Sequence, residues 1–136
     1  MAPETDKPKV HLNWLRIMYV YTIVGAGGIG LAFLIAPSTM LSLLMFPAEE
    51  PILAGIAYSV WLAFGILSAI GLRSPLKFAP VLLLQLTYKV IWFVAVIIPQ
   101  LLLGPLPLFA TVLSGIYATY VIGDIIVIPW QHLFAK

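Results

Sequence analysis

The sequence predicts an all-α integral membrane protein, an antiparallel bundle of four transmembrane helices with a short interfacial segment between spans one and two. Of its 136 residues, 62% are hydrophobic and only 9% are charged, whereas soluble domains average about 45–50% apolar and about 25% charged residues. The apolar residues gather in four runs, each close to the roughly 20 residues that cross a bilayer. A chain of this length is one domain.

The predicted spans lie at about residues 14–36, 51–72, 76–98 and 105–129, with tails at 1–13 and 130–136. Prolines stand near most of their ends, where a missing backbone N–H costs least. The connection Arg73–Pro75 is so short that spans two and three must be antiparallel neighbours. Ser38–Phe46 is apolar but too short to cross, and we expect an interfacial helix or turn capped by Ser38 or Thr39.

An even number of spans places both termini on one side of the membrane, and the basic residues identify that side. It carries Lys7, Lys9, Arg16, Arg73, Lys77 and Lys136. The opposite side has no Lys or Arg, and there Glu49 and Glu50 are expected in a solvated loop. The positive-inside rule therefore predicts that both termini are cytoplasmic. The first apolar run is too long for a typical signal peptide, so we expect no cleavable one.

The stretch Gly25–Gly30, "GAGGIG", matches the G-x-G-x-x-G fingerprint of dinucleotide-binding folds, and acids follow about twenty residues later. That fingerprint requires a strand, a tight turn and a helix start. Here the glycines lie in the middle of an apolar run, where a turn would leave backbone groups without partners in hydrocarbon. We therefore interpret them as small residues that let helices pack closely.

At about 100° per residue, Gly27 and Gly30 lie on one side of the first helix, and Gly25 and Gly28 lie roughly opposite. Two interpretations follow. Either all four glycines allow close packing within one bundle, or Gly27 and Gly30 face the bundle while Gly25 and Gly28 contact a second protomer. In the second case, leucine at the two pairs should give different phenotypes.

Lys89 and Asp124 interrupt the third and fourth spans, and charges inside a membrane are by default functional. Lys89 lies about 16 Å and Asp124 about 7 Å from the cytoplasmic ends of their helices at 1.5 Å per residue. A lysine side chain spans roughly 6 Å of that difference by snorkelling. A direct or water-bridged pair is therefore feasible.

Other polar and aromatic residues share helix faces with these charges. The candidate ligand-binding set is Lys89, Asp124, Gln85, Trp92, Tyr117, Tyr120, Tyr58, Trp61 and Arg16. In one interpretation, Lys89 and Asp124 neutralise each other and fix helix register. In the other, the cluster lines a pocket for an amphiphile or ion, with Lys89 or Arg16 meeting an anionic head group.

Several chemistries are not expected. The chain has no cysteine, and His11 and His132 lack acids at ligand spacing, so we predict no metal site and no cofactor. No motif of a catalytic triad, P-loop or zinc protease is present, so no catalytic residue is assigned. The net charge of +2 without a basic stripe argues against nucleic acid as a partner.

In size and span count the chain resembles the small bacterial inner-membrane proteins grouped as DoxX-like. Pro75–Trp92, "PLKFAPVLLLQLTYKVIW", and Gly123–Trp130, "GDIIVIPW", are similar to segments of small bacterial membrane proteins without an assigned activity. The resemblance implies a bacterial origin and a four-span fold, and it implies no mechanism.

These observations lead to two functional hypotheses. The first is a binding or accessory module, acting as a homo-oligomer or as a subunit of a larger membrane complex. The second is a small transporter or membrane enzyme that handles a lipophilic or anionic amphiphilic substrate at Lys89 and Asp124. In the first, Lys89→Met with Asp124→Leu should fold and assemble while each single change destabilises, because it leaves a lone buried charge.

The predicted orientation can be tested by labelling, because the natural chain has no cysteine. In intact cells, an impermeant maleimide should label a cysteine introduced as Glu49→Cys from the outside and should leave Pro75→Cys unlabelled. The reverse pattern would contradict the topology.

Overall fold

The computed structural model describes residues 11–48 and 50–135, and over these ranges its regular structure is entirely helical. The elements are α1 (Leu12–Thr22), the π-helical turn η2 (Ile23–Gly27), α2 (Gly28–Ile35), α3 (Pro37–Leu43), α4 (Pro51–Gly71), α5 (Ala79–Trp92), the π-helical turn η3 (Phe93–Ile97), α6 (Ile98–Leu103), α7 (Leu108–Val127) and α8 (Trp130–Leu133). Four continuous helices are long and apolar enough to cross a membrane: Leu12–Ile35, Pro51–Gly71, Ala79–Leu103 and Leu108–Val127. The prediction of an all-helical chain with four such helices is confirmed.

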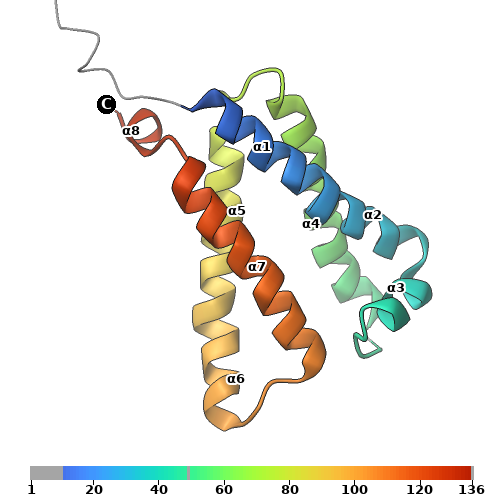
Figure 1. The fold of residues 1–136 in the computed structure, drawn as a ribbon. Coiled ribbons are helices and arrows are strands. Elements are labelled where there is room, and N and C mark those ends of the chain that lie inside the picture. Colours follow the sequence, from blue (N-terminus) through green and yellow to red (C-terminus); the bar gives the residue numbers. More distant parts are fainter. Residues whose placement is uncertain (1–10, 49, 136) are drawn as a thin grey trace, which may run out of the picture.

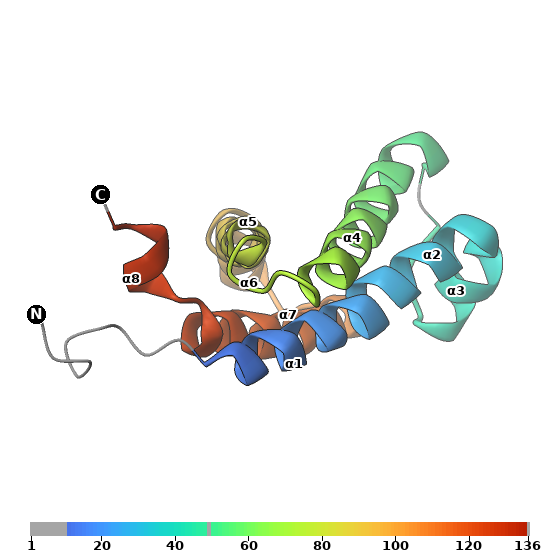
Figure 2. The same cartoon turned by 90° about the horizontal axis from the view of Figure 1, so that it is seen from above.

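The helix formed by α1, η2 and α2 packs along α4, and α5 packs along α7 (Figures 1 and 2). Along the first pair, Tyr19 meets Gly71, Gly27 meets Gly65, and Gly30 meets Tyr58. The partner's residue number falls as that of the first helix rises, so these two helices run in opposite directions. The first helix also contacts α7, which places it between two neighbours.

The third long helix differs from its predicted bounds of 76–98. It begins at Ala79, with Pro80 in its first turn, and it continues through Pro99 to Leu103. Proline removes the hydrogen bond to the carbonyl four residues earlier, which belongs here to Ala95. Ala95 lies inside the π turn η3, where the α-helical hydrogen-bond pattern is already altered. The helix therefore accommodates a proline that the sequence suggested as its end.

The expected short helix between the first two long helices is present as α3, but the expected caps are wrong. Its N-cap is Ala36, and neither Ser38 nor Thr39 caps it. The helix begins earlier because Pro37 occupies the first turn. There its fixed φ favours helix, and an N–H group would have no partner within the helix in any case.

The N-cap of α4 was not predicted. The Glu50 carboxylate accepts hydrogen bonds from the backbone N–H groups of Ile52 and Leu53, at 3.0 and 2.8 Å, and so caps α4. These bonds to Leu53 and Ile52 hold the pKa of Glu50 below its usual value, because they favour the charged form. Glu49 lies outside the described residues.

The four glycines of "GAGGIG" have different surroundings. A Cβ on Gly27 would lie 3.0 Å from the Gly65 Cα, and one on Gly30 would lie 2.7 Å from the Tyr58 carbonyl oxygen, so both face α4. Gly28 is exposed, and a Cβ there would meet nothing closer than 4.0 Å. Gly25, however, packs against the Tyr120 hydroxyl. For Gly25 this agrees with close packing within one bundle and not with contact to a second protomer, because α7 of the same chain covers that side of the helix.

The main apolar core lies where α1, α5 and α7 meet, near the ends of the chain. Its buried members are Leu15, Met18, Tyr19, Leu82, Leu86, Tyr120 and Ile128. The Tyr19 hydroxyl donates to the Pro75 carbonyl oxygen at 2.6 Å, which ties α1 to the connection between α4 and α5. Outside this core the helices expose large apolar side chains, for example Ile35, Ile52 and Leu102 at 73%, 78% and 83% exposure.

The glycine contacts give a matched pair of variants. Gly30→Ala should destabilise the chain by about 2 kcal/mol, because the added methyl group meets the α4 backbone and overpacks the contact. Gly28→Ala should be neutral or stabilising by up to about 1 kcal/mol, because alanine favours helix and the space is open. Thermal unfolding of the purified proteins measures both, and equal destabilisation would contradict this packing.

Candidate binding site

Lys89 is buried on α5, with only 1% of its surface exposed. Its Nζ donates to the Tyr88 hydroxyl at 2.7 Å. The same nitrogen lies 4.3, 4.6 and 4.8 Å from the ring centroids of Tyr88, Tyr120 and Tyr117, and 5.8 Å from that of Phe64. Contacts within about 6 Å of an aromatic face stabilise a cation. Three helices thus supply an aromatic cage for this ammonium group, made of Tyr88, Tyr117, Tyr120 and Phe64.

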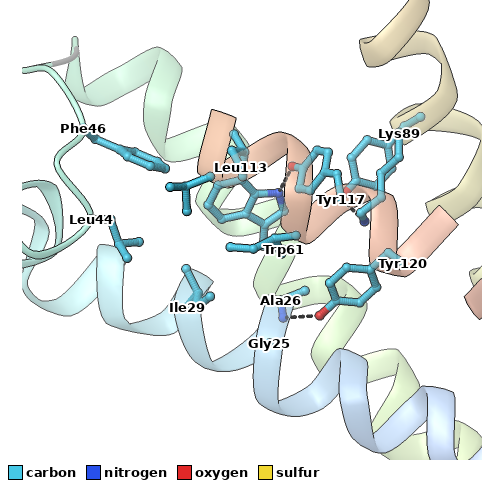
Figure 3. A pocket seen from close by; sticks show the side chains of 13 residues that line it. Gly25, Ala26, Ile29, Leu44, Phe46, Trp61, Lys89, Leu113, Tyr117 and Tyr120 are labelled. Atoms are coloured by element: carbon cyan, nitrogen blue, oxygen red, sulfur yellow. Dashed lines mark hydrogen bonds between the residues drawn. The ribbon is translucent and has the colours of Figure 1, made fainter. Parts of the chain in front are cut away.

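A cavity begins at this cage and extends between α2 and α7 (Figure 3). The space between its lining atoms, counted together with its open mouth, is about 510 Å³, of which about 40 Å³ admits the centre of a water-sized sphere. One end is formed by Trp61, Tyr88, Lys89, Tyr117 and Tyr120, and the remaining lining residues are Gly25, Ala26, Ile29, Leu44, Phe46, Val112, Leu113 and Ile116. From Tyr120 to Val112 the cavity follows α7 for about 12 Å at 1.5 Å per residue. Its lining is apolar except at the end near Lys89.

Hydrogen bonds fix the rings at the polar end. The Tyr117 hydroxyl accepts from the Trp61 indole N–H at 2.9 Å. The Tyr120 hydroxyl accepts from the Ala26 backbone N–H at 3.1 Å and donates to the Tyr21 carbonyl oxygen at 3.2 Å. Ala26 lies in the π turn η2, where the backbone departs from the α-helical pattern. The first helix therefore positions an aromatic ring of α7 through its own backbone.

Asp124 is fully buried on α7 and is held by Gln85 rather than by Lys89. The Gln85 side-chain nitrogen donates to both carboxylate oxygens, at 3.1 and 3.3 Å. It also lies 3.4 Å from the Thr22 hydroxyl oxygen of α1. Lys89 and Asp124 form no salt bridge, because the ammonium group is bound to the Tyr88 hydroxyl in the cage. The direct pair that the sequence made feasible is absent from this conformation, and Gln85 stands between the two charged residues.

The remaining predicted residues lie around or away from this centre. Trp92 packs edge-on against Tyr117, with 4.9 Å between the ring centroids, and Tyr58 stacks on Phe33 at 4.3 Å; neither lines the cavity. Arg16 is exposed near the start of α1, where its Nε donates to the Leu72 carbonyl oxygen at 3.4 Å. Arg16 therefore does not join the group of residues around Lys89.

Tyr88, Phe64 and Phe46 lie at the site although they are not among the residues predicted for it. Tyr88 precedes Lys89 directly, and a tyrosine beside a membrane lysine is a usable signal for a cation contact. Phe64 and Phe46 carry no comparable signal, because an apolar aromatic residue in an apolar segment is ordinary there. Only the packing of α4 and of the connection after α3 brings them to the site.

Among the residues that the structure describes, no group of three or more His, Cys, Asp or Glu side chains could hold a metal ion. Comparison with protein-family models, with curated proteins and with solved structures gives no match for this chain.

The hydrogen bonds of Tyr120 give a test of the site geometry. Tyr120→Phe should destabilise the protein by about 1–2 kcal/mol, because it leaves the Ala26 N–H without its partner in a part-buried position. Tyr21→Phe is the control, because this exposed tyrosine shares its hydroxyl only with Thr119. Thermal unfolding compares the two, and an equal effect of both changes would argue against the role of Tyr120.

Proposed function

We propose that the chain is a multi-pass membrane protein, inserted as an antiparallel four-span bundle with both termini in the cytoplasm of a bacterial cell. Four apolar helices of sufficient length support insertion. The large apolar side chains exposed along these helices also support insertion, because lipid tails solvate apolar side chains better than water does. The distribution of basic residues supports the orientation.

Within the membrane we propose that the protein is a binding module for a lipophilic molecule whose polar head is anionic or otherwise accepts hydrogen bonds. The observation that carries this proposal is the buried Lys89 ammonium group at the polar end of an otherwise apolar cavity. An ammonium group has three N–H donors, and the Tyr88 hydroxyl takes one of them. The other donors are available to a ligand.

The cavity suits such a molecule at both ends. A carboxylate, phenolate or carbonyl oxygen would accept from Lys89 in a site of low dielectric constant, where a charged contact is stronger than in water. The apolar body would lie against Trp61, Leu113 and Ile116 toward Phe46. Apolar walls with a few convergent polar groups are the usual composition of a lipophile site. The aromatic cage holds the ammonium group when no ligand is bound.

We propose that the binding module acts as a homo-oligomer or as a subunit of a larger complex. Native mass spectrometry of gently extracted protein distinguishes these forms. Co-purifying subunits or additional copies would support an accessory role. A retained small molecule on a single chain would support binding alone. A transport or enzymatic role at Lys89 and Asp124 requires, in addition, flux or turnover that disappears in the Lys89→Met Asp124→Leu double variant.

Binding can be measured with a fatty acid brominated in the middle of its chain, because bromine quenches nearby tryptophan fluorescence. In reconstituted vesicles we expect saturable quenching that disappears in Trp61→Phe, since Trp61 lines the cavity. Lys89→Met should raise the half-saturating concentration at least about tenfold, the equivalent of about 1.4 kcal/mol for one charged hydrogen bond.

Two variants accompany this measurement. Lys77→Met removes an exposed lysine outside the long helices and should leave the quenching curve unchanged. Leu113→Phe narrows the cavity without adding a fluorescent tryptophan and should also weaken binding of the brominated acid. If quenching persists unchanged in both Lys89→Met and Leu113→Phe, the proposed site is wrong.

A further inference from the structure

A second buried polar group lies one helical turn from Lys89, and the lipophile site does not use it. It consists of Thr22 on α1, Gln85 on α5 and Asp124 on α7, each with 0% of its surface exposed. We call these three residues the polar layer. Hydrogen-bond distances of 3.1–3.4 Å connect them through the Gln85 side-chain nitrogen.

The polar layer contains more hydrogen-bond acceptors than donors. The Thr22 hydroxyl donates its hydrogen to the Met18 carbonyl oxygen at 2.9 Å, so toward the layer its oxygen can only accept. The Gln85 amide nitrogen has two N–H donors, and three acceptor oxygens share them, those of Thr22 and both of Asp124. The Gln85 side-chain oxygen is buried without a partner. A buried acceptor without a partner is unfavourable, so this arrangement favours an additional positive group.

The remaining long helix, α4, brings another oxygen to the same depth. Ser68 lies on α4 between Gly65 and Gly71, which pack against Gly27 and Tyr19 of the first helix. Thr22 lies between those two positions on α1. The Ser68 hydroxyl oxygen is also buried without a partner, and its residue has 0% exposure. Oxygen atoms from all four long helices are thus found at this level.

Lys89 does not supply the missing positive group in this conformation. Its ammonium donates to Tyr88 and contacts the rings of the aromatic cage. It forms no ion pair with Asp124, which leaves a buried carboxylate with a single amide as its donor. Buried carboxylates are normally paired with a cation or neutralised.

We propose that the polar layer binds a monovalent alkali cation, with Asp124, Thr22 and the Gln85 side-chain oxygen as ligands and Ser68 as a further candidate. Carboxylate, hydroxyl and amide oxygens are the ligands of hard cations. One carboxylate balances a single positive charge, whereas calcium sites usually recruit more oxygen ligands and several carboxylates. A proton on Asp124 would remove the charge and supply a single O–H donor, whereas a cation can contact the carboxylate, the Thr22 oxygen and the Gln85 oxygen together.

The test measures the thermal unfolding of the purified full-length protein in sodium, potassium or choline chloride at equal ionic strength and fixed pH. Sodium or potassium at ten times its dissociation constant should raise the Tm by about 4 °C over choline. Thr22→Val removes an oxygen and keeps the side-chain shape, and it should raise the half-saturating concentration at least tenfold. Asp124→Asn should abolish the cation response.

Thr87→Val is the matched control, because the Thr87 hydroxyl on α5 also donates to a carbonyl oxygen four residues earlier, at 2.7 Å, but is exposed. It should keep the wild-type response. Lys89→Met should also keep or enlarge the rise in Tm caused by sodium or potassium. This result would separate the cation site from the lipophile site. An identical Tm of the wild type in all three salts would overturn the proposal. A Tm that depends on pH and not on the alkali cation would overturn it in favour of a proton.

Discussion

Two ionisable side chains buried on neighbouring helices impose the main constraint on this structure, because each needs partners from inside the protein. A lone buried charge costs about 3–5 kcal/mol when its partner is removed. The chain meets this demand separately for the two residues. Lys89 has a tyrosine hydroxyl and several aromatic faces, and Asp124 has the Gln85 amide. The positions of the surrounding helices follow from bringing these partners within reach.

Close helix packing makes these partnerships geometrically possible. Gly27 and Gly65 let the first helix approach α4 almost backbone to backbone, and Gly25 gives room for Tyr120 on the opposite side. The Tyr120 hydroxyl can then bond both Ala26 and Tyr21. Larger residues at these positions would move the first helix away from α7 and disrupt the aromatic cage. The glycines are therefore part of the site although none of them carries a functional group.

Much of the fold was predictable from residue patterns, and part of the site was not. Apolar runs of membrane length define the four long helices, and Lys89, Asp124, Gln85, Tyr117 and Tyr120 stand out as polar or aromatic residues within them. The boundaries around Pro99 and the caps of α3 were not predictable, because π turns and the first-turn proline decide them locally. The sequence left open whether Gly25 faces the bundle or a second protomer, because helical angles give the side of a helix but not which neighbour covers it. The exclusion of Arg16 likewise depends on how the helices are arranged in space.

The spacing of Gln85 and Lys89 explains why the two proposed sites are adjacent yet separate. Residues four apart lie on one face of a helix, one turn from each other, so α5 presents an amide toward Asp124 and an ammonium group toward the cavity. The Tyr88 hydroxyl keeps the ammonium group on the cavity side. If a ligand head group binds Lys89, it holds the ammonium group on the cavity side. Asp124 is then free to bind another cation. If Lys89 instead moved toward Asp124, it would fill the polar layer and empty the cage. Occupation of the cavity and occupation of the polar layer should therefore favour each other, a positive coupling that must be equal in both directions.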